Sequence, residues 1–165
     1  MANNYLQFAA QLDLLSEDEA AWLKELCLYI NTTYDGDVMP SAFEGLTALG
    51  DAIVEEFESG FDYKFEGNSV TFVSDEGTDP ALIAEIVHQF FRKMRPNGRD
   101  IFTIQWAEFC DKLRVGEFGG GACVVTREEI VSMTTGEWVI DAAVKASDRL
   151  ALKKEKKRGA RSSRR

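Results

Sequence analysis

The stretch FDYKFEGNSVTFVSDEGTDPALIAEIVHQFFRKMRP, residues 61–96, changes its hydrophobic period halfway along. Up to residue 73 apolar and polar residues alternate, which is typical of two half-buried strands, and Glu66-Gly67-Asn68 is the turn between them. From residue 82 onward the apolar positions follow a helical spacing. The stretch therefore predicts a β-hairpin followed by a helix whose core positions are Leu82, Ile83, Ile86, Val87, Phe90 and Phe91.

The predicted helix has clear signals at both ends. Asp79 is a good N-cap residue, and Pro80 suits the first helical position because its missing N–H has no partner there anyway. Basic residues near the other end favour the helix dipole, and Pro96 and Gly98 end the helix. We therefore expect a helix from Pro80 to about Arg95.

Three more strands are predicted downstream. Residues 101–109 alternate, with Phe102, Ile104 and Trp106 on one side, and residues 122–126 are short and apolar, as a central strand would be. Residues 130–134 are expected to return as a hairpin, although the preceding TREE would alternatively cap a helix.

Helices are predicted on both sides of these strands. Apolar spacing favours a short helix over residues 5–15, a second from Ser16, with Glu19 reaching back to the Ser16 amide, and a third over 41–59 after a loop at 31–40. The core stripe of the second helix is expected to be Ala20, Leu23, Leu26, Cys27 and Ile30.

A last helix is predicted over residues 134–153. Thr134 and Glu137 have the spacing of a capping box. The side chains expected to contact the core are Trp138, Ala142, Val144 and Leu150. The pattern predicts an α+β fold, with an antiparallel sheet of four to five strands and about four helices packed mainly on one face. Residues 1–152 are expected to form a single domain, and the basic, apolar-poor residues 153–165 a disordered tail.

The charge is divided unevenly along the chain. The net charge is −9, with 19 basic and 28 acidic residues. Residues 151–165 hold eight of the basic and one of the acidic residues, a net of +7, which leaves 11 basic and 27 acidic residues, a net of −16, in residues 1–150. A strongly acidic body repels nucleic acid and attracts basic partners, although acidic surfaces also simply keep proteins in solution.

The segment GEFGGGA, residues 116–122, has two interpretations. A phosphate-binding loop needs a helix behind it, usually with a Lys-Ser/Thr pair, whereas an apolar strand follows here. We therefore expect the glycines to serve a bulge or a close backbone approach. Phe118 within the segment could either pin the loop to the core or be displayed to a partner.

Catalytic and metal sites have little support in the sequence. Cys27, Cys110 and Cys123 have no CxxC spacing and are expected to be reduced, buried and inert, and with His88 as the one histidine a structural zinc site is not expected. His88 is interpreted as a helix residue rather than a general base, and neither a metal nor a cofactor is predicted.

Two sets of charged residues are candidate binding sites. Acidic side chains arrayed like a phosphate ladder would fit the groove of a basic, nucleic-acid-targeting protein. These interaction candidates, with Phe118, are Glu55, Glu56, Glu58, Asp75 and Glu76. The tail could instead contact phosphates, or fold back on the acidic body, through Lys153, Lys154, Lys156, Lys157, Arg158, Arg161, Arg164 and Arg165.

The motif from Trp106 to Thr126 resembles that of a group of uncharacterised small proteins carried by bacteriophages, plasmids and other mobile elements. The matching positions are Trp106, Glu108, Cys110, Lys112, Arg114 to Ala122, and Thr126, together with Leu15 to Leu23 and a late T-x-x-W. The resemblance covers about residues 12–140, omits the basic tail, and implies no particular activity.

Three functional hypotheses follow. The first is a non-enzymatic mobile-element protein that acts by protein–protein interaction, as an anti-CRISPR-like or anti-restriction-like inhibitor of a host nucleic-acid-targeting defence. The second is a nucleic-acid-binding accessory protein that uses the tail, and the third is an enzyme that uses Cys110 or Cys123. Because the N-terminus lacks a secretory signal and every apolar run is far shorter than the roughly 20 residues of a membrane span, we expect a bacterial cytoplasmic location without membrane contact.

Overall fold

The computed structural model describes residues 4–32, 61–74, 79–111 and 118–162. These residues form six strands and three helices, so the predicted α+β class is confirmed. The predicted number of strands, four to five, was too small. The predicted number of helices, about four, exceeds the three that are described. The predicted loop at 31–40 lies almost wholly, and the predicted helix at 41–59 entirely, outside the described residues. The elements are β1 (Asn4–Asp13), α1 (Glu17–Thr32), β2 (Asp62–Glu66), β3 (Ser69–Ser74), α3 (Pro80–Met94), β4 (Phe102–Cys110), β5 (Gly119–Val125), β6 (Ile130–Thr134) and α4 (Thr135–Ser162).

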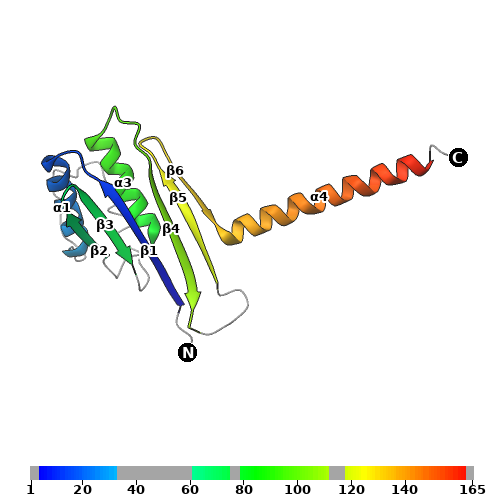
Figure 1. Cartoon of the computed structure of the whole chain (residues 1–165), viewed down its shortest axis with the longest axis horizontal. Coiled ribbons are helices and arrows are strands. Elements are labelled where there is room, and N and C mark those ends of the chain that lie inside the picture. Colours follow the sequence, from blue (N-terminus) through cyan, green and yellow to red (C-terminus); the bar gives the residue numbers. More distant parts are fainter. Residues whose placement is uncertain (1–3, 33–60, 75–78, 112–117, 163–165) are drawn as a thin grey trace.

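The six strands form one antiparallel sheet in the order β2-β3-β1-β4-β5-β6. Helices α1 and α3 lie against one face of this sheet (Figure 1). Helix α4 instead leaves the end of β6 and points away from the sheet (Figure 1). The other face of the sheet is therefore left uncovered by the described helices, and we call it the open face.

Residues 4–13 form a strand, so the predicted helix at 5–15 is wrong. Burial alternates along β1: Phe8, Ala10 and Leu12 are buried, whereas the residues between them are exposed. The same short segment fits both the helical and the strand period, and the pairing of β1 with β3 on one side and β4 on the other decides between them. Leu15, the last residue of that predicted helix, is 75% exposed.

The hairpin and the helix that follows it are confirmed. Strands β2 and β3 pair antiparallel around Gly67, whose φ of 56° suits a residue without a Cβ. Asp79 caps α3 by accepting a 2.8 Å hydrogen bond from the Ala81 amide, and Pro80 occupies the first turn. The six core positions predicted for this helix are all buried: Leu82, Ile83, Ile86, Val87, Phe90 and Phe91.

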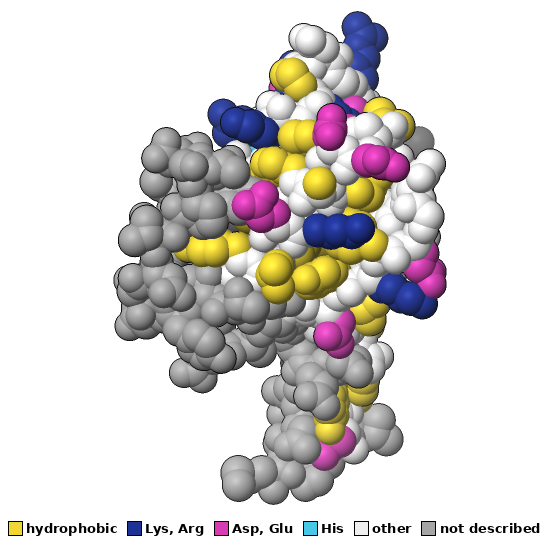
Figure 2. Space-filling model, turned by 90° about the vertical axis from the view of Figure 1, so that its left-hand side faces the viewer, with side chains coloured by type: hydrophobic (Ala, Val, Ile, Leu, Met, Phe, Trp, Pro, Cys, Tyr) yellow, Lys and Arg dark blue, Asp and Glu magenta, His cyan; other side chains and the backbone are white. Residues whose placement is uncertain are grey.

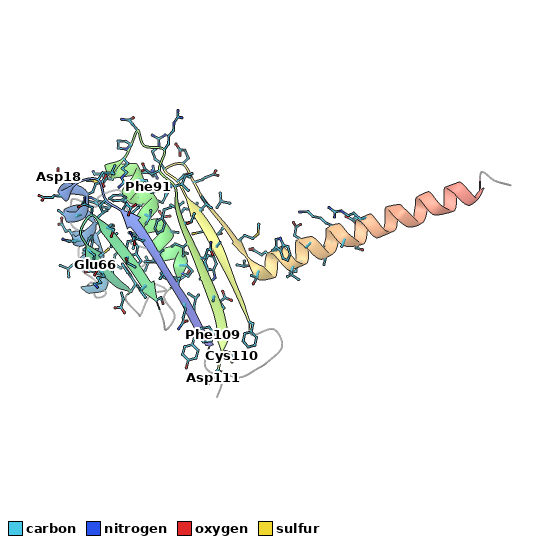
Figure 3. The ribbon with its side chains drawn as sticks, viewed as in Figure 1. Asp18, Glu66, Phe91, Phe109, Cys110 and Asp111 are labelled. Carbon is cyan, nitrogen blue, oxygen red and sulfur yellow. The ribbon has the colours of Figure 1, made fainter. Side chains whose placement is uncertain are left out.

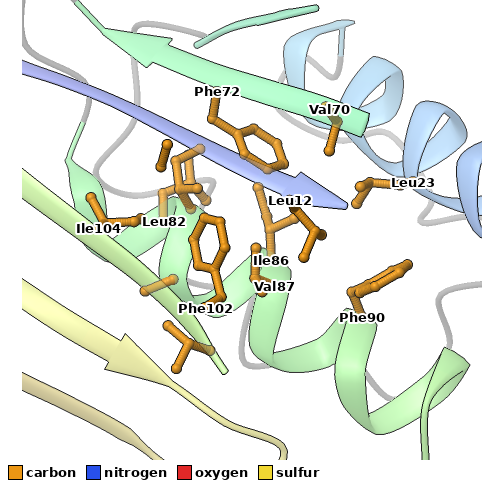
Figure 4. Packing of buried hydrophobic residues seen from close by; sticks show 14 of the residues in the cluster. Leu12, Leu23, Val70, Phe72, Leu82, Ile86, Val87, Phe90, Phe102 and Ile104 are labelled. Carbon is orange, nitrogen blue, oxygen red and sulfur yellow. The ribbon is translucent and has the colours of Figure 1, made fainter. Parts of the chain in front are cut away.

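One hydrophobic core fills the space between the sheet and the helices α1 and α3. Phe72 of β3 and Phe102 of β4 meet edge to face, with ring centroids 6.5 Å apart, and both point toward α3 (Figure 4). Leu23 of α1 closes the same core beside Val70 (Figure 4). Strands β1, β3 and β4 thus give one side of their alternating pattern to the core and the other to the open face.

Helix α4 begins as predicted and then differs from the prediction. Thr134 and Glu137 form the capping box: the Glu137 amide donates to the Thr134 hydroxyl at 3.2 Å, and the Thr134 amide donates to the Glu137 carboxylate at 2.9 Å. The core contacts predicted for Trp138 and Val144 are wrong, since both side chains are more than half exposed, and Ala142 is half-buried. The side chain of Leu150, the fourth predicted contact, lies outside the described ones. The helix also continues through Ser162, across most of the segment that we expected to be disordered, because Ala, Leu, Lys, Arg and Glu all favour helix.

A buried ion pair ties α1 to the end of α3. Arg95 donates to both carboxylate oxygens of Glu19 at 2.8 Å, to Asp100 at 2.9 Å and to the backbone carbonyl of Asp13 at 2.7 Å. Glu19 accepts in addition from the Leu15 amide at 2.7 Å, not from Ser16 as predicted, because its carboxylate is turned toward Arg95. The hydrogen bonds from Arg95 hold the pKa of Glu19 below its ordinary value against the opposing effect of burial.

We expect Arg95→Ala to lower the free energy of unfolding by about 3–5 kcal/mol, because it leaves the buried Glu19 carboxylate without its counter-ion. The matched control is Lys145→Ala, which breaks the exposed pair with Asp141 and should cost less than about 0.5 kcal/mol. Urea unfolding of the two variants measures both values. Equal losses would show that the buried pair has no special role.

Candidate functional site

The three consecutive glycines, Gly119 to Gly121, lie inside a strand, whereas residues 116 and 117 lie outside the described part. Strand β5 starts at Gly119, three residues earlier than predicted, and pairs with β4 on one side and β6 on the other. In this register Gly121 is opposite Trp106 and Gly120 is opposite Ala107. The expectation of a close backbone approach is confirmed.

Two of the glycines have no room for a side chain. A Cβ on Gly121 would lie 2.3 Å from Cζ2 of Trp106, so the indole ring crosses β5 at this position. A Cβ on Gly120 would lie 2.3 Å from the Trp106 carbonyl oxygen, and Gly120 has a φ of +150°, which other residues rarely adopt. Gly121 therefore leaves room for the Trp106 side chain, and Gly120 leaves room for the backbone of Trp106.

Beside Trp106, a groove of about 470 Å³ lies between the first turns of α3 and the strands β4, β5 and β6. Cys123 lies on its floor, and burial raises the pKa of that thiol. Two carboxylates line the groove, but the carboxylate of Asp79 is occupied by the α3 cap and that of Glu85 accepts a 2.7 Å hydrogen bond from Gln89. A protonated thiol and two engaged carboxylates do not make a nucleophilic centre.

His88 lies beside the strands, where its Nδ1 is 2.7 Å from the backbone carbonyl oxygen of Thr126. This contact joins α3 to the turn before β6, which fits the prediction of a structural helix histidine. Within residues 4–32, 61–74, 79–111 and 118–162, no three His, Cys, Asp or Glu side chains gather as metal ligands would.

The most unusual surface of the molecule is formed by α4 and the neighbouring part of the open face. Four large hydrophobic side chains in seven residues of α4 are 54–67% exposed: Trp138, Val139, Ile140 and Val144. On the open face the exposed pairs Val124–Val131 and Ala122–Met133 are directly opposite each other on β5 and β6. A hollow of about 340 Å³ at the base of α4 connects the two sets, and Gln105, Ala122, Met133 and Trp138 are among the residues that line it. We call these eight hydrophobic residues, four on α4 and four on the sheet, the α4 surface.

Sequence reasoning missed this surface. It assigned Trp138 and Val144 to the core because they are apolar, although the run WVIDAAV is apolar on several sides of the helix rather than along one stripe. A helix that is apolar all round needs contacts on more than one side. That signal could have indicated a partner before the structure was known.

The predicted interaction residues do not come together at one described site. Phe118 precedes β5 and is 51% exposed, so it is displayed rather than pinned to the core. The acidic candidates Glu55, Glu56, Glu58, Asp75 and Glu76 all lie outside the described residues. The tail candidates from Lys153 to Arg161 lie within helix α4, whereas Arg164 and Arg165 lie outside the described residues.

Charges are interspersed on the side of the molecule formed by α1 and the β2–β3 hairpin. There, acidic and basic side chains lie among hydrophobic ones in the described residues (Figure 2). Residues 33–60 hold seven acidic and no basic residues, so a large part of the net charge of the body comes from outside the described part. The acidic character is a property of the whole body and not of one described patch.

Comparison of the chain with protein-family models, with curated proteins and with solved structures finds no match. The resemblance to mobile-element proteins therefore stays a prediction. In the part of the chain that the structure describes, none of the helices combines the length and the apolar character that a membrane crossing requires.

Gly120→Ala should lower the free energy of unfolding by at least about 2 kcal/mol, because the new methyl group meets backbone atoms that cannot move aside and the φ is strained. Gly136→Ala is the matched control: Gly136 lies in α4 with open space around it, so alanine should be neutral or stabilise by up to about 1 kcal/mol. Thermal and urea unfolding report both. A Gly120→Ala protein as stable as the parent would refute the close approach of the Trp106 and Ala107 backbone at Gly120.

The three cysteines should resist alkylation in the folded protein, since all are buried. Burial raises the pKa of Cys27 from 9.0 to about 12, which lowers its thiolate fraction at neutral pH about a thousandfold. Its reaction with iodoacetamide should therefore stay slow until the pH approaches 12. Peptide mapping after a timed reaction, with the urea-unfolded chain as reference, measures each thiol. Native Cys123 reacting as fast as the unfolded chain would support a cysteine-dependent enzyme.

Proposed function

We propose that the protein acts without catalysis, by binding another protein through the α4 surface. One observation carries this proposal: Trp138, Val139, Ile140 and Val144 stand 54–67% exposed on a helix that projects from the sheet. Single exposed apolar residues are ordinary, but a contiguous set beside an apolar sheet face marks an interaction site.

The energetics of the α4 surface suit a binding site. Fully burying one Val, Ile or Trp-sized side chain contributes about 1.5–3 kcal/mol. A few such residues, with tryptophan the most frequent among them, supply most of the affinity in a typical interface. The capping box fixes the start of α4 to the end of β6, so the helix is held in place before a partner arrives.

The partner of such a surface is expected to combine apolar and charged contacts. The base of α4 is apolar, whereas positions 151–162 hold six basic residues and one acidic residue. The body, with its net charge of −16, attracts basic proteins in turn. Inhibition of a nucleic-acid-targeting host enzyme through the acidic body stays a prediction. Affinity capture from a lysate would also detect such an enzyme.

Ile140→Ser with Val144→Ser should reduce capture of the partner at least tenfold while changing stability by less than about 0.5 kcal/mol, because both side chains are exposed. The measurement is affinity capture from bacterial lysate with quantitative mass spectrometry. Ile101→Ser, at a 68% exposed residue before β4, is the control and should capture as well as the parent. Equal capture by all three proteins would count against α4 as the binding site.

A second candidate function rests on the extension of α4. Because the helix continues through Ser162, six basic positions are carried on a projecting helix, and a helix of this kind can enter the major groove of DNA. Removal of residues 153–165 would then abolish nucleic-acid binding, and binding by the intact chain would weaken steeply with salt. Absence of binding at low salt would exclude this function.

A further inference from the structure

The open face changes in character from one edge to the other. At β5 and β6 it is apolar, with Ala122, Val124, Val131 and Met133. At the opposite edge, β2 and the end of β1 turn four charged side chains to the same face. Three of the four are acidic, and one of these, Glu66, pairs with Lys64, which leaves the edge with a net negative charge. Glu66, one of them, lies at the edge of the sheet remote from α4 (Figure 3). The four charged residues are Asp13, Asp62, Lys64 and Glu66.

Helix α4 changes in the same order. Its first turns are apolar from Trp138 to Val144, and its last turns are basic, with a net charge of +5 over positions 151–162. Apolar residues would meet apolar residues, and basic positions would meet acidic ones, if the helix crossed an open face from β6 to β2. The two surfaces are therefore complementary in both hydrophobicity and charge.

The lengths agree as well. At 1.5 Å per residue, the 28 residues of α4 span about 42 Å, and the basic positions 153–161 lie about 27–39 Å from its start. Neighbouring strands lie about 4.8 Å apart, so six strands set beside β6 would extend about 29 Å beyond it. Positions 153–161 would thus reach β2, with its acidic residues Asp62 and Glu66, in a second sheet placed against the β6 edge.

The helix cannot make this contact within its own chain, because it points away from its own sheet (Figure 1). It extends beyond β6, which is an edge strand. Residues 130–134 contain none of the lysines or prolines that commonly protect such an edge. A second copy that approaches this edge comes within reach of α4.

We propose that two copies of this chain form a reciprocal dimer, in which α4 of each copy lies across the open face of the other. This inference rests on the proposed function, since it names the protein that α4 binds. The dimer covers both parts of the α4 surface, and it places the basic end of each chain on the acidic body of its partner.

The test begins with the mass of the full chain in solution. Two copies of the 18.5 kDa chain give 37 kDa by light scattering on a sizing column. Ile140→Ser with Val144→Ser on α4, or Val131→Lys with Met133→Lys on the open face, should each return the mass to 18.5 kDa. Leu28→Lys, at a 57% exposed residue of α1, is the control that should leave the dimer intact.

Mixing the two monomeric variants distinguishes a reciprocal dimer from other assemblies. The open-face variant still has a native α4, and the α4 variant still has a native open face, so one of the two contacts can form. The mixture should therefore recover part of the 37 kDa species. Removing residues 153–165 should weaken the dimer at least tenfold and flatten its salt dependence, because it removes the charged contact.

Different results separate this inference from the proposed function. A chain that stays at 18.5 kDa at its highest soluble concentration, yet captures another protein through α4, overturns the dimer and keeps the proposed function. A monomer whose capture is unaffected by the α4 substitutions refutes both. A mass increase that disappears on nuclease treatment overturns the dimer in favour of nucleic-acid binding.

Discussion

The guanidinium of Arg95 is the contact on which the arrangement of the helices over the sheet depends. It joins three parts of the chain: Glu19 in the first turn of α1, the Asp13 carbonyl at the end of β1, and Asp100 before β4. Phe90 and Phe91 lie beneath it, with ring centroids 5.1 and 5.7 Å from Cζ. Because the charges are buried, their attraction is poorly screened, and the loss of one partner leaves the other without compensation.

Local patterns were sufficient to predict the elements whose own residues determine them. The hairpin at Gly67, the capped start of α3 at Asp79 and the capping box at Thr134 all depend on residues within a few positions of each other, and all were predicted correctly. Strand β1 and the pairing of Glu19 with Arg95 depend on residues far along the chain, and neither was predicted. Long-range contacts also decide the surroundings of α4. Its apolar residues indicate burial, but the local sequence does not show whether they are buried in the core of the same chain or against another molecule.

The two faces of the sheet have different roles. On the covered face, Gly121 of β5 accommodates Trp106, which is one of the residues that line the groove beside α3. On the open face, the same strand displays Ala122 and Val124 beside α4. One strand therefore satisfies a packing requirement with its glycines and contributes to the proposed binding surface with the residues after them.

The position of β1 determines when the sheet can be completed during synthesis. This strand is made before the other five strands of the sheet, yet it lies between β3 and β4, and its residues pair with Val70 and Cys110. Such long-range pairing closes large loops and folds slowly. The centre of the sheet stays incomplete until residue 110 has left the ribosome. Until then β1 has at least one edge without a hydrogen-bonded partner strand, and one face of the strand is apolar. The nascent chain is consequently most exposed to aggregation before β4 is made, and a message truncated there would yield a product that chaperones and proteases must remove.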